Sequence, residues 1–235
     1  MTVPQHLSEL TRTAPEPNRP SGYSLALNVL PLAYFAGGVV AVWFPEGAMM
    51  RFALALAWIY LLPPIAARAV LALFGPAEGE RLVQDSRAYR VWWLLTQLQV
   101  IFNRFPLLEE FLRLIPGAYG SWLNLWGSKV SLLVYWGPGA LITDRYALRI
   151  GPGAVIGTRS VLSGHLAFKN ENGEFRVTLA PVEIGAGVLI GAYAGIGPGC
   201  RVADGEEVPA AAFLRPHTHW SEGSRMKSAR PRSTG

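Results

Sequence analysis

Cysteine and charged residues are scarce in this sequence. It has one cysteine in 235 residues, and only 16% of the chain is Asp, Glu, Lys or Arg, whereas soluble domains usually have roughly 25%. A single cysteine excludes a disulfide framework within the chain, and a hydrophobic fraction of 51% excludes an intrinsically disordered protein. The low charge content and the eight tryptophans indicate that much of the chain contacts lipid.

The charges that are present give a formal net charge of +5 without a nucleic-acid motif. The sequence has no lysine-rich patch, no zinc-ligand spacing and no aromatic RNA-binding motif. The anionic headgroups of membrane lipids are therefore the expected partner, and nucleic acid is not.

Two long apolar runs follow a polar N-terminal arm. Residues 1–22 contain four prolines and no apolar periodicity, which predicts a flexible arm. Residues 23–45 have no charged side chain, and residues 52–74 have one, Arg68, near the end of the run. Each run is close to the roughly 20 residues that a membrane-spanning helix needs. We therefore expect two transmembrane helices over residues 23–75.

Both ends of this predicted hairpin lie on the same side of the membrane. The connecting turn around Glu46 and Gly47 is short, and arginines are more numerous before and after the hairpin than within the turn. Because loops rich in Lys and Arg face the cytoplasm, we expect a multi-pass protein of the bacterial inner membrane. Its C-terminal bulk would lie on the cytoplasmic side.

Residues 76–127 are rich in Trp, Leu and Phe, but prolines and charges prevent them from spanning a membrane. Apolar residues between Leu107 and Ile115 recur at helical spacing, opposite the charges. We expect interfacial, amphipathic helices, because tryptophan prefers headgroup depth and this segment contains Trp92, Trp93, Trp122 and Trp126. The alternative is that these helices cover the open end of the C-terminal domain.

The C-terminal half carries a repeat with a period of six residues. An aliphatic residue followed by glycine recurs in two runs, which start at Ile150 and at Ile184. This period predicts a parallel β-helix over residues 128–214, in which each hexapeptide forms one flat side and three make a coil. Glycine permits the tight corner. The basic residues 215–235 are expected to form a flexible tail.

The repeat resembles that of the hexapeptide-repeat acyltransferases over residues 130–214. The resemblance implies a mainly β fold, a left-handed parallel β-helix, here preceded by the transmembrane hairpin and the interfacial helices. It also implies an acyl thioester co-substrate, either acyl-CoA or acyl carrier protein, with no permanently bound cofactor. In this family the donor lies along glycine-rich turns between two subunits, which places it near Gly191, Ala192, Gly197 and Pro198.

A polar excursion interrupts the repeat between Leu162 and Ile184, and His165 lies at its start. In family members that acetylate sugars and related hydroxyls, a similar histidine precedes an excursion that returns through a Pro-Ile/Val-x-Ile-Gly segment, here residues 181–185. A neutral imidazole can accept a proton near pH 7, so we expect His165 to be the general base. Four candidates could orient its imidazole: Asn170, Glu171, Glu174 and Glu183. We expect Cys200 to pack in the wall.

The predicted transmembrane hairpin is joined to a β-helix that resembles an acyltransferase. This combination predicts a membrane-bound acyltransferase that modifies a hydroxyl or amine of a lipid-linked or amphiphilic acceptor. A domain of only about four to five coils would leave apolar wall exposed, which predicts a homotrimer. One alternative is a non-catalytic membrane-anchored scaffold. Another is a γ-class carbonic anhydrase, but its three histidines would have to converge on the wall, and His217 and His219 follow the last predicted coil. We expect no metal site.

Overall fold

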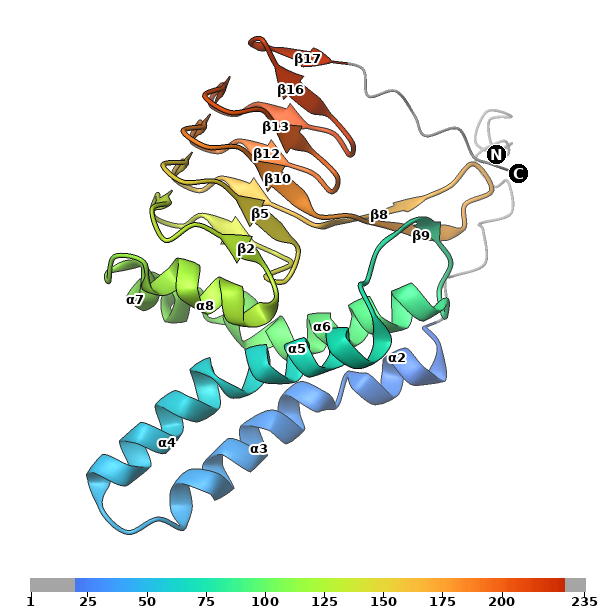
Figure 1. Ribbon diagram of the computed structural model, residues 1–235. Coiled ribbons are helices and arrows are strands. Elements are labelled where there is room, and N and C mark those ends of the chain that lie inside the picture. Colours follow the sequence, from blue (N-terminus) through green and yellow to red (C-terminus); the bar gives the residue numbers. More distant parts are fainter. Residues whose placement is uncertain (1–19, 227–235) are drawn as a thin grey trace, which may run out of the picture.

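The computed structural model describes residues 20–226 and consists of a group of helices and a stack of short strands (Figure 1). Two helices, α3 and α4, project away from the strands, and we call them the projecting pair. The other helices form the helical base beneath the stack. The helices are α2 (Gly22–Leu27), α3 (Leu30–Trp43), α4 (Ala48–Tyr60), α5 (Leu62–Phe74), α6 (Arg87–Arg104), α7 (Leu107–Arg113) and α8 (Ala118–Trp126).

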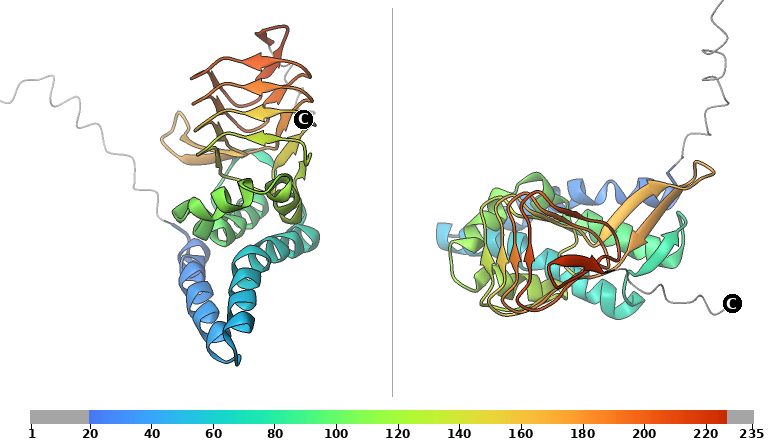
Figure 2. Two further views of the ribbon diagram at one scale, coloured as in Figure 1. Left: turned by 90° about the vertical axis from the view of Figure 1, so that its left-hand side faces the viewer. Right: turned by 90° about the horizontal axis from the view of Figure 1, so that it is seen from above.

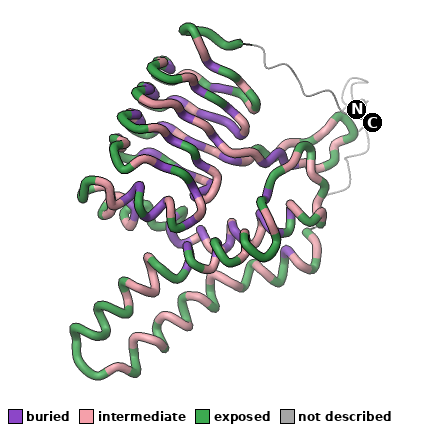
Figure 3. The backbone as a smooth tube through the Cα atoms, in the orientation of Figure 1, coloured by how far each residue is buried: buried purple, intermediate pink, exposed green. Residues whose placement is uncertain are grey.

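The projecting pair belongs to two apolar stretches that also include α2 and α5. Gly22–Trp43 has 22 residues and Ala48–Phe74 has 27, and both are long and apolar enough, by length and composition, to cross a membrane. The Tyr34 hydroxyl donates to the Trp58 carbonyl oxygen over 2.7 Å, and Trp58 Nε1 donates to the Tyr34 carbonyl oxygen over 3.2 Å. Nearer the turn, the side chains of the pair are exposed or half-buried (Figure 3).

The tryptophans of α6 and α8 lie inside the protein. Trp92 and Trp122 are 4% exposed and Trp126 is fully buried, while Trp93 is half-buried. These rings therefore pack against protein, and the interfacial position of this segment stays a prediction. A protein core removes a large apolar ring from water just as a headgroup layer does. The helices cover one end of the strand stack, as the alternative interpretation proposed (Figure 2).

Helix α7 turns its charged side inward and its apolar side outward. Glu109 is 3% exposed, whereas Leu107 is 70% and Phe111 is 60% exposed. Leu108 and Leu112 are half-buried against the core, whereas Leu107 and Phe111 face outward. Leu107 and Phe111 remain available for contact with a lipid surface.

Residues 128–221 form three parallel sheets, one on each side of a structure that we call the prism. Consecutive strands pass from face 1 to face 2 to face 3, and successive coils are in register, with Ile150 beside Ile184 and Ile184 beside Val202. Face 1 contains β2 (Lys129–Val130), β5 (Leu148–Ile150), β10 (Val182–Ile184), β13 (Arg201–Val202) and β16 (His219–Ser221). Face 2 contains β3 (Tyr135–Trp136), β6 (Val155–Ile156), β11 (Leu189–Ile190) and β14 (Glu207–Val208). Face 3 contains β4 (Leu141–Ile142), β7 (Val161–Leu162), β12 (Gly195–Ile196) and β15 (Phe213–Leu214).

The interior of the prism is a column of aliphatic side chains from the predicted repeat positions. Ile142, Ile156 and Ile190 are fully buried. The glycine that follows each aliphatic residue faces the backbone of the next coil: a Cβ on Gly157 would lie 2.5–2.6 Å from backbone atoms of residues 190–192. The predicted parallel hexapeptide strands are confirmed, and the left-handed winding stays a prediction.

The prism extends beyond its predicted end at Leu214. β16 pairs in parallel with β13, and Trp220 occupies an inward position at 7% exposure. Residues 215–221 therefore belong to the last coil and not to a flexible tail, and β17 (Ser224–Met226) folds back on β16. The remainder of the predicted tail and residues 1–19 of the predicted arm lie outside the described residues.

The polar excursion is a β-hairpin of β8 (His165–Lys169) and β9 (Phe175–Leu179). β1 (Gly79–Leu82), which lies between α5 and α6 in the chain, pairs with β9 in an antiparallel orientation. The excursion is thereby attached to the helical base (Figure 1).

Candidate active site

His165 lies where the chain leaves the corner between face 3 and face 1. The preceding strand, β7, stacks on β4, with Leu162 beside Ile142. Asp144 follows Ile142 at the same corner, one coil nearer the helical base. This stacking brings His165 Nδ1 to 2.7 Å from Asp144 Oδ2.

The Asp144 carboxylate is almost completely buried, at 1% exposure. Its Oδ2 also accepts hydrogen bonds from the Gly164 amide (2.9 Å) and the Thr143 hydroxyl (2.6 Å). Burial raises the pKa of Asp144, but the hydrogen bond and charge of His165 and the bonds from Thr143 and Gly164 outweigh it and lower the pKa overall. Asp144 is therefore a carboxylate at neutral pH.

The His165 side chain is 28% exposed, and the negative charge of Asp144 stabilises its protonated form. Burial lowers the pKa of His165, while the hydrogen bond and charge of Asp144 raise it, and the net pKa is above its ordinary value. Because the carboxylate accepts a hydrogen bond from Nδ1–H, the neutral ring has its lone pair on Nε2. Such an imidazole can accept a proton from a hydroxyl or amine.

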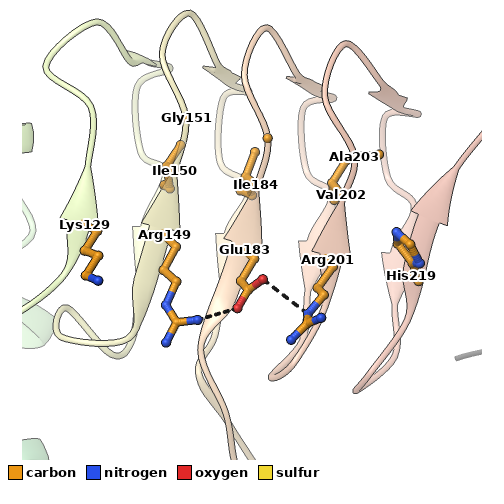
Figure 4. A pocket seen from close by; sticks show the side chains of 11 residues that line it. Lys129, Arg149, Ile150, Gly151, Glu183, Ile184, Arg201, Val202, Ala203 and His219 are labelled. Atoms are coloured by element: carbon orange, nitrogen blue, oxygen red, sulfur yellow. Dashed lines mark hydrogen bonds and ion pairs between the residues drawn. The ribbon is translucent and has the colours of Figure 1, made fainter. Parts of the chain in front are cut away.

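The orienting carboxylate is not one of the four predicted candidates. Asn170 and Glu174 bond to each other across the tip of the excursion, and Glu171 is exposed there. Glu183 lies on the outer surface of face 1, between Arg149 (2.6 Å) and Arg201 (3.2 Å) (Figure 4). The sequence does carry a signal for Asp144: the interval from Ile142 to Ile150 is eight residues and not six, so this corner holds two additional residues.

The four residues predicted to line the donor site lie at two different corners. Gly197 and Pro198 follow β12 at the corner of His165, one coil above it, where the Ser163 amide donates to the Ile196 carbonyl oxygen. Both are buried. Gly191 and Ala192 are half-buried at the corner between face 2 and face 3. One chain therefore does not bring all four residues next to His165.

The cysteine and the other two histidines of the described residues lie away from the Asp144–His165 pair. Cys200 is fully buried, and burial raises the pKa of its thiol. His217 Nε2 lies 2.6 Å from Glu80 Oε1, and His219 projects from the outer surface of face 1 (Figure 4). Among residues 20–226, no group of three or more His, Cys, Asp or Glu side chains could hold a metal ion.

No protein-family model matches this chain, and no curated protein matches it. A solved maltose O-acetyltransferase from Clostridium difficile 630 is 13% identical, and the match covers 51% of this chain and 82% of that protein with a TM-score of 0.33. Serine acetyltransferase from Neisseria gonorrhoeae is 14% identical, with 83% and 92% coverage and a TM-score of 0.24. Serine acetyltransferase isoform 3 from Entamoeba histolytica is 13% identical, with 90% coverage of both chains and a TM-score of 0.25. The fold described above rests on the repeat and strand register of this chain.

Proposed function

We propose that the protein is a membrane-bound acyltransferase. It would move an acyl group from a thioester donor to a hydroxyl or amine of a lipid-linked or amphiphilic acceptor. The observation that carries this proposal is the hydrogen-bonded pair of Asp144 and His165 at the start of the excursion. A scaffold that only held partners together would have no need of a buried carboxylate against an accessible imidazole.

In the proposed reaction, His165 Nε2 removes the proton from the acceptor hydroxyl or amine as the acceptor attacks the thioester carbonyl carbon. Asp144 stabilises the imidazolium that forms and holds the ring in the required tautomer. The carbon–sulfur bond then breaks, and the proton passes from His165 to the leaving thiolate. The acyl group is transferred directly, so no acyl-enzyme is required.

Acyl-CoA or acyl carrier protein is the proposed donor, and a homotrimer is the proposed assembly. Faces 2 and 3 expose apolar side chains: Tyr135 is 64% exposed on face 2 and Phe213 is 55% exposed on face 3. The outer surface of face 1, in contrast, carries a column of charges (Figure 4). Packing faces 2 and 3 against other copies would bury this apolar area.

We propose that the projecting pair anchors the protein in the bacterial inner membrane, with the prism on the cytoplasmic side. The two apolar stretches and the outward apolar side of α7 support the attachment, and the arginines before and after the hairpin support the cytoplasmic side. Arg68, the one charge in the second predicted apolar run, is directed to the helical base, where its Nη1 donates to the Asn124 carbonyl oxygen over 3.1 Å. The anchor would hold the site close to an amphiphilic acceptor.

Transfer of label from donor to lipid tests this function. Purified protein in mild detergent is incubated with acetyl-CoA labelled in the acetyl group and a total lipid extract of bacterial membranes. We expect label in the organic phase with wild-type protein and its loss with His165→Ala. Equal labelling by the two proteins, or no labelled lipid across donors of different chain length, would contradict the proposal.

A further inference from the structure

Helix α6 contacts His165 directly and Asp144 through its neighbour, Arg145. Helix α6 belongs to the helical base, whereas both members of the pair belong to the prism. The contacts are made by side chains that the proposed mechanism does not use.

Arg145 follows Asp144 directly and is completely buried. Its amide nitrogen donates to Gln99 Oε1 on α6 over 2.7 Å, and this amide belongs to the peptide group that joins Asp144 to Arg145. Its guanidinium donates from Nη1 to Asn103 Oδ1 on α6 (2.9 Å) and from Nε to Glu109 Oε1 on α7 (2.5 Å). The backbone immediately after Asp144 is therefore fixed to two helices of the base.

The His165 imidazole is held by the same helix, from another direction. The ring of Trp92 lies on the imidazole with their centroids 5.1 Å apart and their planes at 55°. Trp92 is 4% exposed, so its ring cannot change position without disturbing the core. Trp93, the next residue, stacks on Tyr89 and donates from Nε1 to the Ser24 carbonyl oxygen.

A buried ion pair such as Arg145–Glu109 is weak evidence for stability, because apolar side chains of similar size often stabilise a fold as well. Such a pair and its hydrogen bonds do fix the orientation of the groups that they join. Here they fix the backbone of a corner that has two additional residues. The regular six-residue coil does not constrain these residues.

We propose that the helical base positions the Asp144–His165 pair, with Gln99 and Arg145 fixing the carboxylate and Trp92 fixing the imidazole. These are positioning residues, since each acts through Asp144 or His165 and none takes up a proton or the acyl group in the proposed mechanism. The expected change in kcat rests on the proposed function. The effect of the helical base on the His165 imidazole can be measured without turnover.

The first test is Gln99→Met, with Gln97→Met as the matched control. Gln97 lies on the same helix, is 8% exposed and has Asn28 as its side-chain partner (3.5 Å). We expect Gln99→Met to lower kcat by about 10- to 100-fold with little change in KM, because small misplacements of reacting groups have effects of this size. Gln97→Met should keep the wild-type kcat.

The second test is Trp92→Phe against Trp122→Phe, which keeps the proposal testable if Gln99→Met does not fold. Trp122 is as buried as Trp92, and its ring packs on Phe102 and Trp126. For every variant, the pKa of His165 is measured by NMR titration of its labelled imidazole, and folding is checked by thermal unfolding. We expect the His165 pKa to fall toward its ordinary value in Gln99→Met and to change in Trp92→Phe, but not in the two controls.

Folded Gln99→Met and Trp92→Phe proteins with a wild-type kcat and His165 pKa would overturn the proposal. Equal losses in the matched controls would also overturn it, because the effect would then be general loosening of the core. If the wild-type protein transfers no acyl group, the proposed function fails, and the NMR titration still decides whether the base positions the pair.

Discussion

At the scale of single residues, the Asp144–His165 pair links the proposed reaction to pH. A general base must be unprotonated, and Asp144 raises the pKa of His165 above its ordinary value. The wild-type kcat/KM should therefore rise with pH through a midpoint above about 6.5. Asp144→Asn removes the charge, so we expect the midpoint to move to lower pH while the plateau falls by about 10²- to 10⁴-fold.

The measurement is kcat/KM from pH 5 to 9 for both proteins. Glu183→Gln is the control, because Glu183 lies on the outer surface of face 1 and pairs with Arg149 and Arg201. A midpoint that stays in place in Asp144→Asn would mean that another group titrates in the rate profile.

The sequence identified one half of this pair and missed the other. His165 was predictable because it stands at the point where a regular repeat stops. Asp144 lies 21 residues earlier, and only the stacking of β7 on β4 brings the two together. The four predicted candidates follow His165 in the sequence, but the hairpin carries three of them away from the corner, and Glu183 lies on the outer surface of face 1.

At the scale of elements, the coils depend on glycine for two separate physical reasons. A Cβ on Gly157 would collide with the next coil, whereas Gly187 has open space but a φ of +64°. We expect Gly187→Ala to destabilise the protein by about 1–2 kcal/mol, the cost of the left-handed backbone. Gly157→Ala should cost more than about 3 kcal/mol, because backbone and not a flexible side chain has to move.

Denaturant unfolding of the two variants, monitored by far-UV circular dichroism, compares these costs. Equal destabilisation would show that the coils can separate at the corner. A smaller effect for Gly157→Ala than for Gly187→Ala would contradict the close stacking outright.

The strands of the prism could be predicted from a strict period, but the helices could not be placed from composition. Most strands repeat the same inward aliphatic position, so register follows directly from spacing. Trp122 and Trp126 indicate only that a large apolar surface is covered, and either lipid or protein can cover it. The end of the prism was predicted too early because the inward position of the last coil is occupied by Trp220 and not by an aliphatic residue.

At the scale of the whole molecule, the orientation of the proposed anchor can be tested by cysteine labelling. The native Cys200 is fully buried, so a single added cysteine would report on its own position. We expect Glu46→Cys, in the turn of the projecting pair, to react with an impermeant thiol reagent added outside intact cells. Ser224→Cys, at the far end of the prism, should react only after the cells are opened.

Reaction of Ser224→Cys from outside would reverse the proposed orientation. Reaction of neither cysteine until the cells are opened would show that the projecting pair does not cross the membrane. Recovery of the full-length protein in the soluble fraction without detergent would show that the projecting pair does not anchor the protein in a membrane.

The most direct test of the central claim compares thioester consumption by His165→Ala and His219→Ala with the wild-type protein at saturating donor. His219 provides the control because it projects from the outer surface of face 1. We predict that His165→Ala keeps its fold and slows turnover by about 10²- to 10⁴-fold, the usual contribution of a positioned general base, while His219→Ala stays within about twofold of wild type. Near-normal turnover by a folded His165→Ala protein would contradict the account.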